Sequence, residues 1–86
     1  MNDKVAIKIL YVEDEPDLRE RIRIVLEMYF TQVIAASNGK EGLELFANHL
    51  PDIVVSDIKM PVMDGLELAK RIRKITPETP VILTTA

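Results

Sequence analysis

Three acidic side chains of this sequence stand where they could act together, each at the end of an apolar run. Glu13 and Asp14 follow the run AIKILYV, and Asp57 ends the run IVVSD. Two like charges about 4 Å apart repel by roughly 1 kcal/mol in water and about 4 kcal/mol near a protein surface, so three close acids need a cation. Carboxylate oxygens suit Mg²⁺, and a carboxylate beside Mg²⁺ can accept a phosphoryl group. The residues therefore predict a Mg²⁺ site with Asp57 as the nucleophile.

The same acids also allow an ordinary structural interpretation. Taken singly, Glu13 or Asp14 would be a helix cap or a solvated loop residue, because acids favour the positive end of a helix dipole. Pro16, which suits the first turn of a helix, follows this acidic stretch directly. Only the convergence of all three acids favours a metal site, so the elements that position them decide between the two interpretations.

Apolar, β-branched runs alternate with segments of helical periodicity along the chain. Strands are expected at residues 6–12, 31–37, 53–57 and 81–85. The helices between them repeat apolar residues at spacings of three and four: Leu18, Ile22, Val25, Leu26 and Tyr29 in the first, Leu43, Phe46 and Leu50 in the second, and Leu68, Ile72 and Ile75 in the third. This alternation predicts an α/β protein with a flavodoxin-like, doubly wound parallel sheet of about four strands in the order 2-1-3-4 and three helices.

That strand order places the acids in one crevice. The direction of winding reverses between the first and third strands, and ligands of such sheets bind at the carboxyl ends of the strands that flank the reversal. Glu13 and Asp14 follow the first strand, and Asp57 ends the third. The predicted fold therefore favours the metal interpretation.

Composition narrows the possible functions. The chain has 86 residues, enough for one small domain, and its net charge of −3 without a basic stripe argues against direct nucleic-acid binding. Cysteine is absent, which excludes disulfides and thiolate sites, and the one histidine, His49, cannot build a histidine-rich metal site. The N-terminal apolar run is broken by Lys8 and followed by acids, so we expect no signal peptide, no membrane span and a cytoplasmic location.

Three segments, YVEDEP, SDIKMPVMDG and VILTTA, resemble in order and spacing the receiver domain of two-component response regulators. The resemblance implies that Glu13 and Asp14 bind Mg²⁺ and that Asp57 takes a phosphoryl group from a sensor histidine kinase. It also implies that Lys59 lends its backbone carbonyl to the metal and that Thr85 supplies the switch hydroxyl, with Thr84 the less favoured neighbour. The first helix, which carries Arg19 and Arg23, resembles the kinase-docking surface of receivers, although such a cluster is usually a solvated face.

The resemblance ends after the fourth strand. Complete receivers continue through a further helix, strand and helix and carry a lysine, usually followed by proline, that pairs with the phosphoryl group; this sequence contains no Lys-Pro. We therefore expect residues 1–86 to be a partial receiver domain. Its fourth strand would be an uncharged edge beside an uncovered sheet face, so we expect a homodimer or higher oligomer through one of these surfaces.

Three functions remain open. The favoured one is a phosphoacceptor signalling module, which is not an enzyme. The second is a catalytically silent receiver fragment that acts in self-assembly or interaction. The third, an aspartate-nucleophile phosphatase resembling the haloacid-dehalogenase type, is disfavoured because Lys59 stands where those enzymes carry a second acid.

Overall fold

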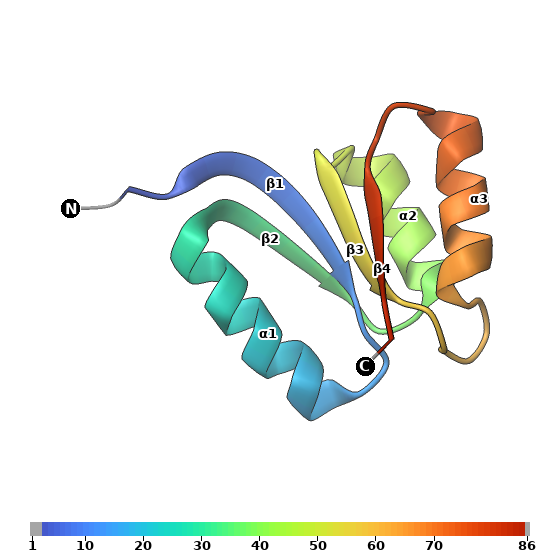
Figure 1. Ribbon diagram of the computed structural model, residues 1–86, viewed down its shortest axis with the longest axis horizontal. Helices are drawn as coiled ribbons and strands as arrows, with labels where there is room; N and C mark the ends of the chain where they lie inside the picture. The colour runs from blue at the N-terminus through green and yellow to red at the C-terminus, as the bar shows by residue number, and fades with distance from the viewer. Residues whose placement is uncertain (1–2, 86) are drawn as a thin grey trace.

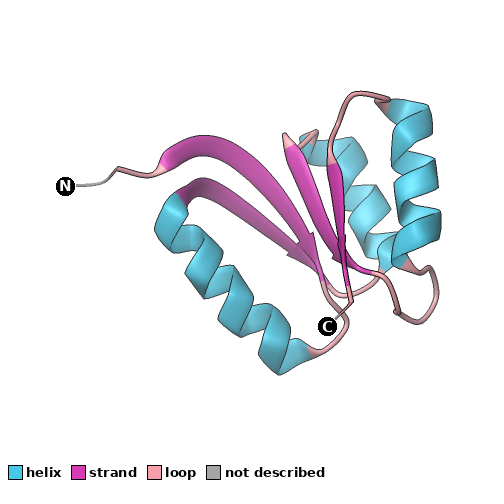
Figure 2. Cartoon of the chain, in the orientation of Figure 1, coloured by secondary structure: helices cyan, strands magenta, loops and turns pink. Residues whose placement is uncertain are grey.

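A single sheet separates helices on its two faces in the computed structural model, which describes residues 3–85 (Figure 1). The elements in chain order are β1 (Val5–Val12), α1 (Pro16–Tyr29), β2 (Phe30–Ala36), α2 (Gly39–His49), β3 (Ile53–Asp57), α3 (Gly65–Ile75) and β4 (Val81–Thr84). The strands are all parallel and lie in the order β2-β1-β3-β4, with α1 on one face and α2 and α3 on the other (Figure 2). The predicted α/β, flavodoxin-like fold is confirmed.

The register of the strands brings the carboxyl ends of β1, β3 and β4 to one edge of the sheet. Val12 of β1 lies opposite Ser56 of β3, and Asp57 lies opposite Thr84 at the end of β4. Glu13 follows β1 directly, and its N–H donates to the carbonyl of Ala36 at the end of β2 over 3.0 Å. The first and third strands are neighbours, so the residues that end them meet at the predicted reversal of winding.

Each helix begins at a side chain that accepts hydrogen bonds from otherwise unpaired backbone N–H groups. Glu15 caps α1 and accepts from the N–H groups of Asp17 and Leu18, at 3.2 and 2.6 Å. Asn38 caps α2 and accepts from the N–H of Glu41, and Asp64 caps α3 and accepts from the N–H of Glu67. These caps fix the first residue of every helix and thereby the length of the loop that joins it to the preceding strand.

The main core lies between the sheet and the pair of helices α2 and α3. Its fully buried side chains come from β1, β3 and both helices: Leu10, Val12, Val54, Phe46, Leu68 and Ile72. Burying an apolar side chain of this size contributes about 1.5–3 kcal/mol. The core thus holds β1 and β3 in a fixed relation and positions the acids at their ends.

The opposite face of the sheet is covered only in part. α1 packs on β2 and β1, and within residues 3–85 no helix lies over β3 and β4 on that side (Figure 1). Ile82 of β4 is therefore 52% exposed. A groove of about 230 Å³ runs beside α1 and is lined by Tyr11, Glu13, Leu18, Ile22, Val55 and Thr84.

Two boundaries differ from the sequence-based expectation. Leu50, expected within the second helix, lies after its end in the left-handed conformation with φ of 46°, where it is 60% exposed. Thr85, expected within the fourth strand, follows it, because β4 ends at Thr84. The remaining strand boundaries agree with the predicted ranges to within one residue.

Candidate functional site

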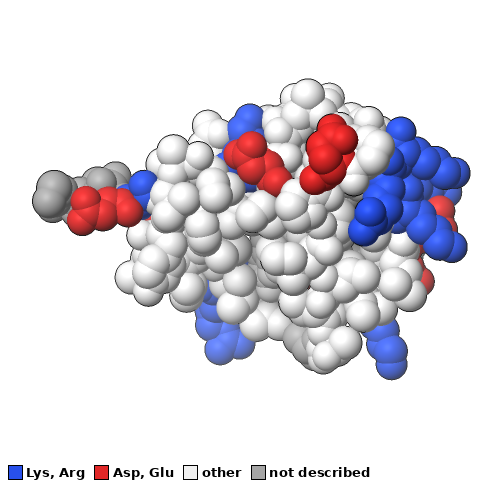
Figure 3. All heavy atoms as spheres, turned by 45° about the horizontal axis from the view of Figure 1, so that its top comes forward, with Lys and Arg blue, Asp and Glu red and all other residues white. Residues whose placement is uncertain are grey.

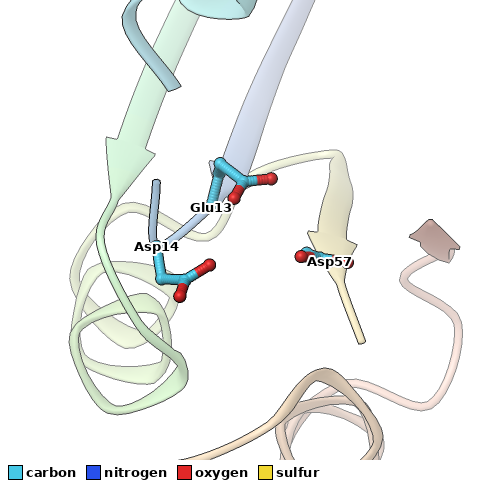
Figure 4. A group of neighbouring side chains, drawn as sticks. All are labelled: Glu13, Asp14 and Asp57. Carbon is cyan, nitrogen blue, oxygen red and sulfur yellow. The ribbon is translucent and has the colours of Figure 1, made fainter. Parts of the chain in front are cut away.

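The three predicted acids form one cluster at the carboxyl edge of the sheet. One carboxylate oxygen from each of Glu13, Asp14 and Asp57 lies within 4.8 Å of the others. Glu13 and Asp57 are only 3% and 7% exposed. Figure 4 shows the side chains of Glu13 and Asp14 directed toward Asp57. The three acids therefore converge, as the metal-site interpretation requires and as an ordinary helix cap does not.

Asp57 is held by the backbone that follows it. Its Oδ1 accepts a hydrogen bond from the N–H of Ile58 at 2.9 Å, and the buried hydroxyl of Ser56 donates to its main-chain carbonyl, also at 2.9 Å. Gly65, at the start of α3, donates its N–H to the carbonyl of Ile58 at 2.8 Å, and a Cβ at Gly65 would collide with the Asp57 carbonyl. The loop after β3 is thus closed by a glycine with no room for a side chain.

Burial and the closeness of like charges dominate the electrostatics of the cluster. The pKa of Glu13 is raised, first by burial and then by the neighbouring charges of Asp57 and Asp14, while the hydrogen bond from the N–H of Glu15 opposes the rise. Burial, together with the charges of Glu13 and Asp57, raises the pKa of Tyr11 to about 12. The site carries an excess of negative charge that a cation would relieve.

The donor set of the cluster fits Mg²⁺. All three side chains offer carboxylate oxygens, the ligands that hard divalent ions prefer, and they come from rigid strand ends. Glu13 and Asp57 are buried, and desolvated carboxylates without a positive partner cost free energy. The residues therefore agree with the metal that the sequence predicts.

A cavity of about 290 Å³ opens beside Asp57. Its lining includes Asp57, Ile58, Lys59 and Thr85. Thr85 thus shares this cavity with the central acid, whereas Thr84 lines the separate groove beside α1. The structure brings Lys59 and Thr85 next to Asp57; the carbonyl and hydroxyl roles assigned to them remain predictions.

The loop between β3 and α3 contains a strained turn that the sequence did not predict. Val62 has φ of 73° and is 78% exposed, and the N–H of Met63 donates to the carbonyl of Pro61 at 2.8 Å across it. A positive φ is unfavourable for a β-branched residue. The N–H of Gly39 at the start of α2 holds the turn through the carbonyl of Met63 at 3.2 Å. Neighbouring elements therefore fix the loop that carries Lys59.

Sequence reasoning also missed a contact of α1 with the acidic segment. Arg19 donates from Nη1 to the main-chain carbonyl of Glu13 at 2.9 Å. Arg23, one turn later, pairs instead with Glu20 and Glu27 on its own helix. The two arginines that form one cluster in the sequence thus have different partners, and only a contact between the helix and the preceding loop distinguishes them.

The surface charge is less uniform than the net charge indicates. Basic side chains gather at the end of the molecule where α3 lies (Figure 3). α3 contributes four exposed basic residues in its second half: Lys70, Arg71, Arg73 and Lys74. This patch is a local departure from the expected absence of a basic stripe. Among the described residues, no helix is long and apolar enough to cross a bilayer.

Comparison with known proteins agrees with the fold and with the motifs. Residues 9–86 match the family model of the response regulator receiver domain. A receiver domain protein from Clostridium thermocellum superposes with a TM-score of 0.88 at 37% identity, over 94% of this chain and 65% of that one. One chain of a solved complex of histidine kinase ThkA with response regulator protein TrrA gives a TM-score of 0.84 at 41% identity, over 93% of this chain and 69% of that chain.

Among curated sequences, Response regulator MprA of Mycobacterium sp. (strain KMS) is 39% identical over 82 residues, which are 95% of this chain and 36% of the relative. The chain thus spans about two thirds of the solved receiver structures and a smaller part of that regulator. The family match extends over nearly the whole sequence and includes every acid of the cluster. The chain therefore belongs to the response regulator receiver domain family.

Proposed function

We propose that this chain is a phosphoacceptor module that takes a phosphoryl group from a sensor histidine kinase onto Asp57, with Mg²⁺ as its cofactor. The observation that supports the proposal most is the cluster of Glu13, Asp14 and Asp57, whose oxygens lie within 4.8 Å of one another beside an open cavity. The choice of partner is supported by the solved complex of a relative with a histidine kinase.

In the proposed reaction an oxygen of Asp57 attacks the phosphorus of phosphohistidine, the P–N bond breaks, and its electron pair leaves with the imidazole. Bound Mg²⁺ would offset the negative charge of the phosphoryl oxygens. Glu13, Asp14, Asp57 and the carbonyl of Lys59 would hold the ion, and the Thr85 hydroxyl would donate a hydrogen bond to a phosphoryl oxygen. The chain is then the acceptor in a signalling step and not an enzyme.

The intact mass of the chain after incubation with acetyl phosphate and Mg²⁺ tests the proposal. We expect a gain of one phosphoryl group that hydroxylamine removes, because hydroxylamine cleaves acyl phosphates, and that chelation of Mg²⁺ prevents. Retention of the added mass in hydroxylamine would show that the phosphoryl group is not on a carboxylate and would contradict the role of Asp57.

The absence of any mass gain, with Mg²⁺ still bound, would favour the second candidate, a catalytically silent module of interaction. One specific observation supports this candidate. Within residues 3–85 β4 pairs only with β3, so its outer edge presents unpaired backbone groups beside the exposed Ile82. We propose that two copies associate through this edge or through the adjoining uncovered sheet face.

Sedimentation velocity over a range of concentrations tests the association. We expect a species larger than a monomer at high concentration, and Ile82→Lys should shift it to monomer because the new charge would lie at the edge that pairs. Leu66→Lys is the matched control, since Leu66 of α3 is 53% exposed but lies on the helix pair at the other face. A strictly monomeric parent chain would contradict the proposed oligomer. The expected cytoplasmic location stays a prediction.

A further inference from the structure

Arg19 of α1 donates a hydrogen bond to the main chain of the loop that precedes its own helix. It lies in the first turns of α1, is half-buried, and turns back along the chain to donate from Nη1 to the carbonyl of Glu13 at 2.9 Å. The acceptor is thus a neutral main-chain oxygen rather than a carboxylate. An arginine that acted only through its charge would not need a hydrogen bond to a neutral oxygen.

The contact completes a set of hydrogen bonds around Glu13. The N–H of Glu13 donates to the carbonyl of Ala36 at 3.0 Å, and its carboxylate Oε2 accepts from the N–H of Glu15 at 3.1 Å. With Arg19 on the carbonyl, the backbone donor, the backbone acceptor and the side chain of Glu13 all have partners. The segment that leads from β1 into α1 is therefore held from β2 on one side and from α1 on the other.

The charge of Arg19 also influences acidic groups beyond the loop to which it is bonded. Hydrogen bonds from the N–H and hydroxyl of Ser37 chiefly lower the pKa of Glu41, and the charge of Arg19 adds to that effect. The same charge partly opposes the rise of the Tyr11 pKa, which burial causes in the main. The charge of Arg19 therefore acts on groups of β1 and α2, in addition to the hydrogen bond that its guanidinium donates to the loop.

We propose that Arg19 is a positioning residue: through its bond to the Glu13 carbonyl it holds residues 13–15 so that the carboxylates of Glu13 and Asp14 converge on Asp57. The inference rests on the proposed Mg²⁺ site and concerns how this chain builds it. Partners that orient metal ligands influence metal affinity without touching the ion.

The sign of the effect on Mg²⁺ affinity separates positioning from charge. Arg19 is a cation near a cation site, so if its charge alone mattered, its removal would strengthen Mg²⁺ binding. If it holds the ligands in place, its removal weakens binding. For Arg19→Met, which keeps an apolar stem but no donor, we expect a three- to tenfold weaker Mg²⁺ affinity, about the effect of one lost hydrogen bond. Arg19→Lys, which keeps the charge and one donor group, should fall between the parent and Arg19→Met.

The experiment compares Mg²⁺ titrations by calorimetry with amide hydrogen exchange of the metal-free chain. Arg23→Met is the matched control, because Arg23 lies one turn later on the same helix and bonds to Glu20 and Glu27. We expect faster exchange at the N–H groups of Glu13 and Glu15 in Arg19→Met and parent rates at both in Arg23→Met. Melting temperatures of all variants show whether a change is local or global.

Unchanged exchange at Glu13 and Glu15, or tighter Mg²⁺ binding by Arg19→Met, would overturn the positioning role. An equal loss of affinity in Arg23→Met would overturn it as well, since the loss would then follow from weakening α1. A parent chain that binds no Mg²⁺ would instead refute the metal site of the proposed function. The exchange rates would in that case still decide whether Arg19 holds the segment.

Discussion

Asp57→Asn is expected to abolish phosphoryl acceptance and, in the same variant, to raise the stability of the metal-free chain. Asparagine is nearly isosteric, and its side-chain oxygen can still accept the hydrogen bond that Ile58 donates to Asp57 at 2.9 Å. The variant removes one of three charges whose oxygens lie within 4.8 Å of one another. We expect a gain of about 1 kcal/mol, which corresponds to about 4–8 °C in Tm for a domain of this size.

Thermal denaturation with and without Mg²⁺ measures the expected change. A ligand that binds only the folded state raises stability with its concentration, so the parent should gain stability from Mg²⁺ and Asp57→Asn should gain much less. Glu44→Gln is the matched control, because it removes one charge from the exposed face of α2, away from the cluster. A lower Tm of metal-free Asp57→Asn would contradict the view that the three acids repel one another.

The pH dependence of stability should change in the same variant. Since the folded-state pKa of Glu13 is raised above its ordinary value of 4.5, the ionised form of Glu13 disfavours folding. This cost is absent below the unfolded-state pKa and develops as the pH rises through the raised value. Metal-free stability should therefore fall across that window, and it should fall less in Asp57→Asn, because one of the charges that raise the Glu13 pKa is gone.

The sequence was sufficient for the architecture and for the acids because both follow from local patterns. Apolar runs that end at Val12 and Asp57 predict buried parallel strands, and the winding rule then brings their carboxyl ends together. Such signals depend on neighbours in the chain and need no knowledge of distant contacts.

The features that escaped prediction depend on contacts between elements. Val62 adopts a positive φ in a loop that is tied to α2 and α3 by hydrogen bonds from the N–H groups of Gly39 and Gly65. Valine itself gives no sign of such a turn. Arg19 is indistinguishable in sequence from Arg23, since both lie on one helix face with acids nearby. The only signal in the sequence is the separation of six residues between Arg19 and Glu13. This separation is too long for a side-chain pair on one helix, but an arginine in the first turn of a helix can reach back to the loop before it.

Gly65→Ala is expected to reduce both stability and phosphoryl acceptance, because the start of α3 lies directly against Asp57 at the end of β3. A Cβ at Gly65 would collide with the main-chain carbonyl of Asp57 and lie 3.1 Å from Cα of Ile58, and neither backbone atom can move without the loop. Overpacking of this kind costs about 1–3 kcal/mol. Chemical denaturation would measure this cost, and the acetyl phosphate reaction should slow since Asp57 and the Lys59 carbonyl are displaced together.

Gly42→Ala is the matched control for Gly65→Ala. It also replaces a helical glycine by alanine, but the new Cβ meets side-chain atoms and no backbone atom. The new Cβ would lie 3.0 Å from Cγ2 of Val12 and 3.4 Å from Cδ2 of Leu68, which are side-chain atoms that can shift by a few tenths of an ångström. Alanine in a helix interior is also favoured over glycine by about 1 kcal/mol, so we expect Gly42→Ala to remain within about 1 kcal/mol of the parent. If Gly65→Ala proved equally stable and equally reactive, α3 would not be needed to fix the carbonyl of Asp57, and the loop after β3 would have to adapt without moving the Asp57 carboxylate.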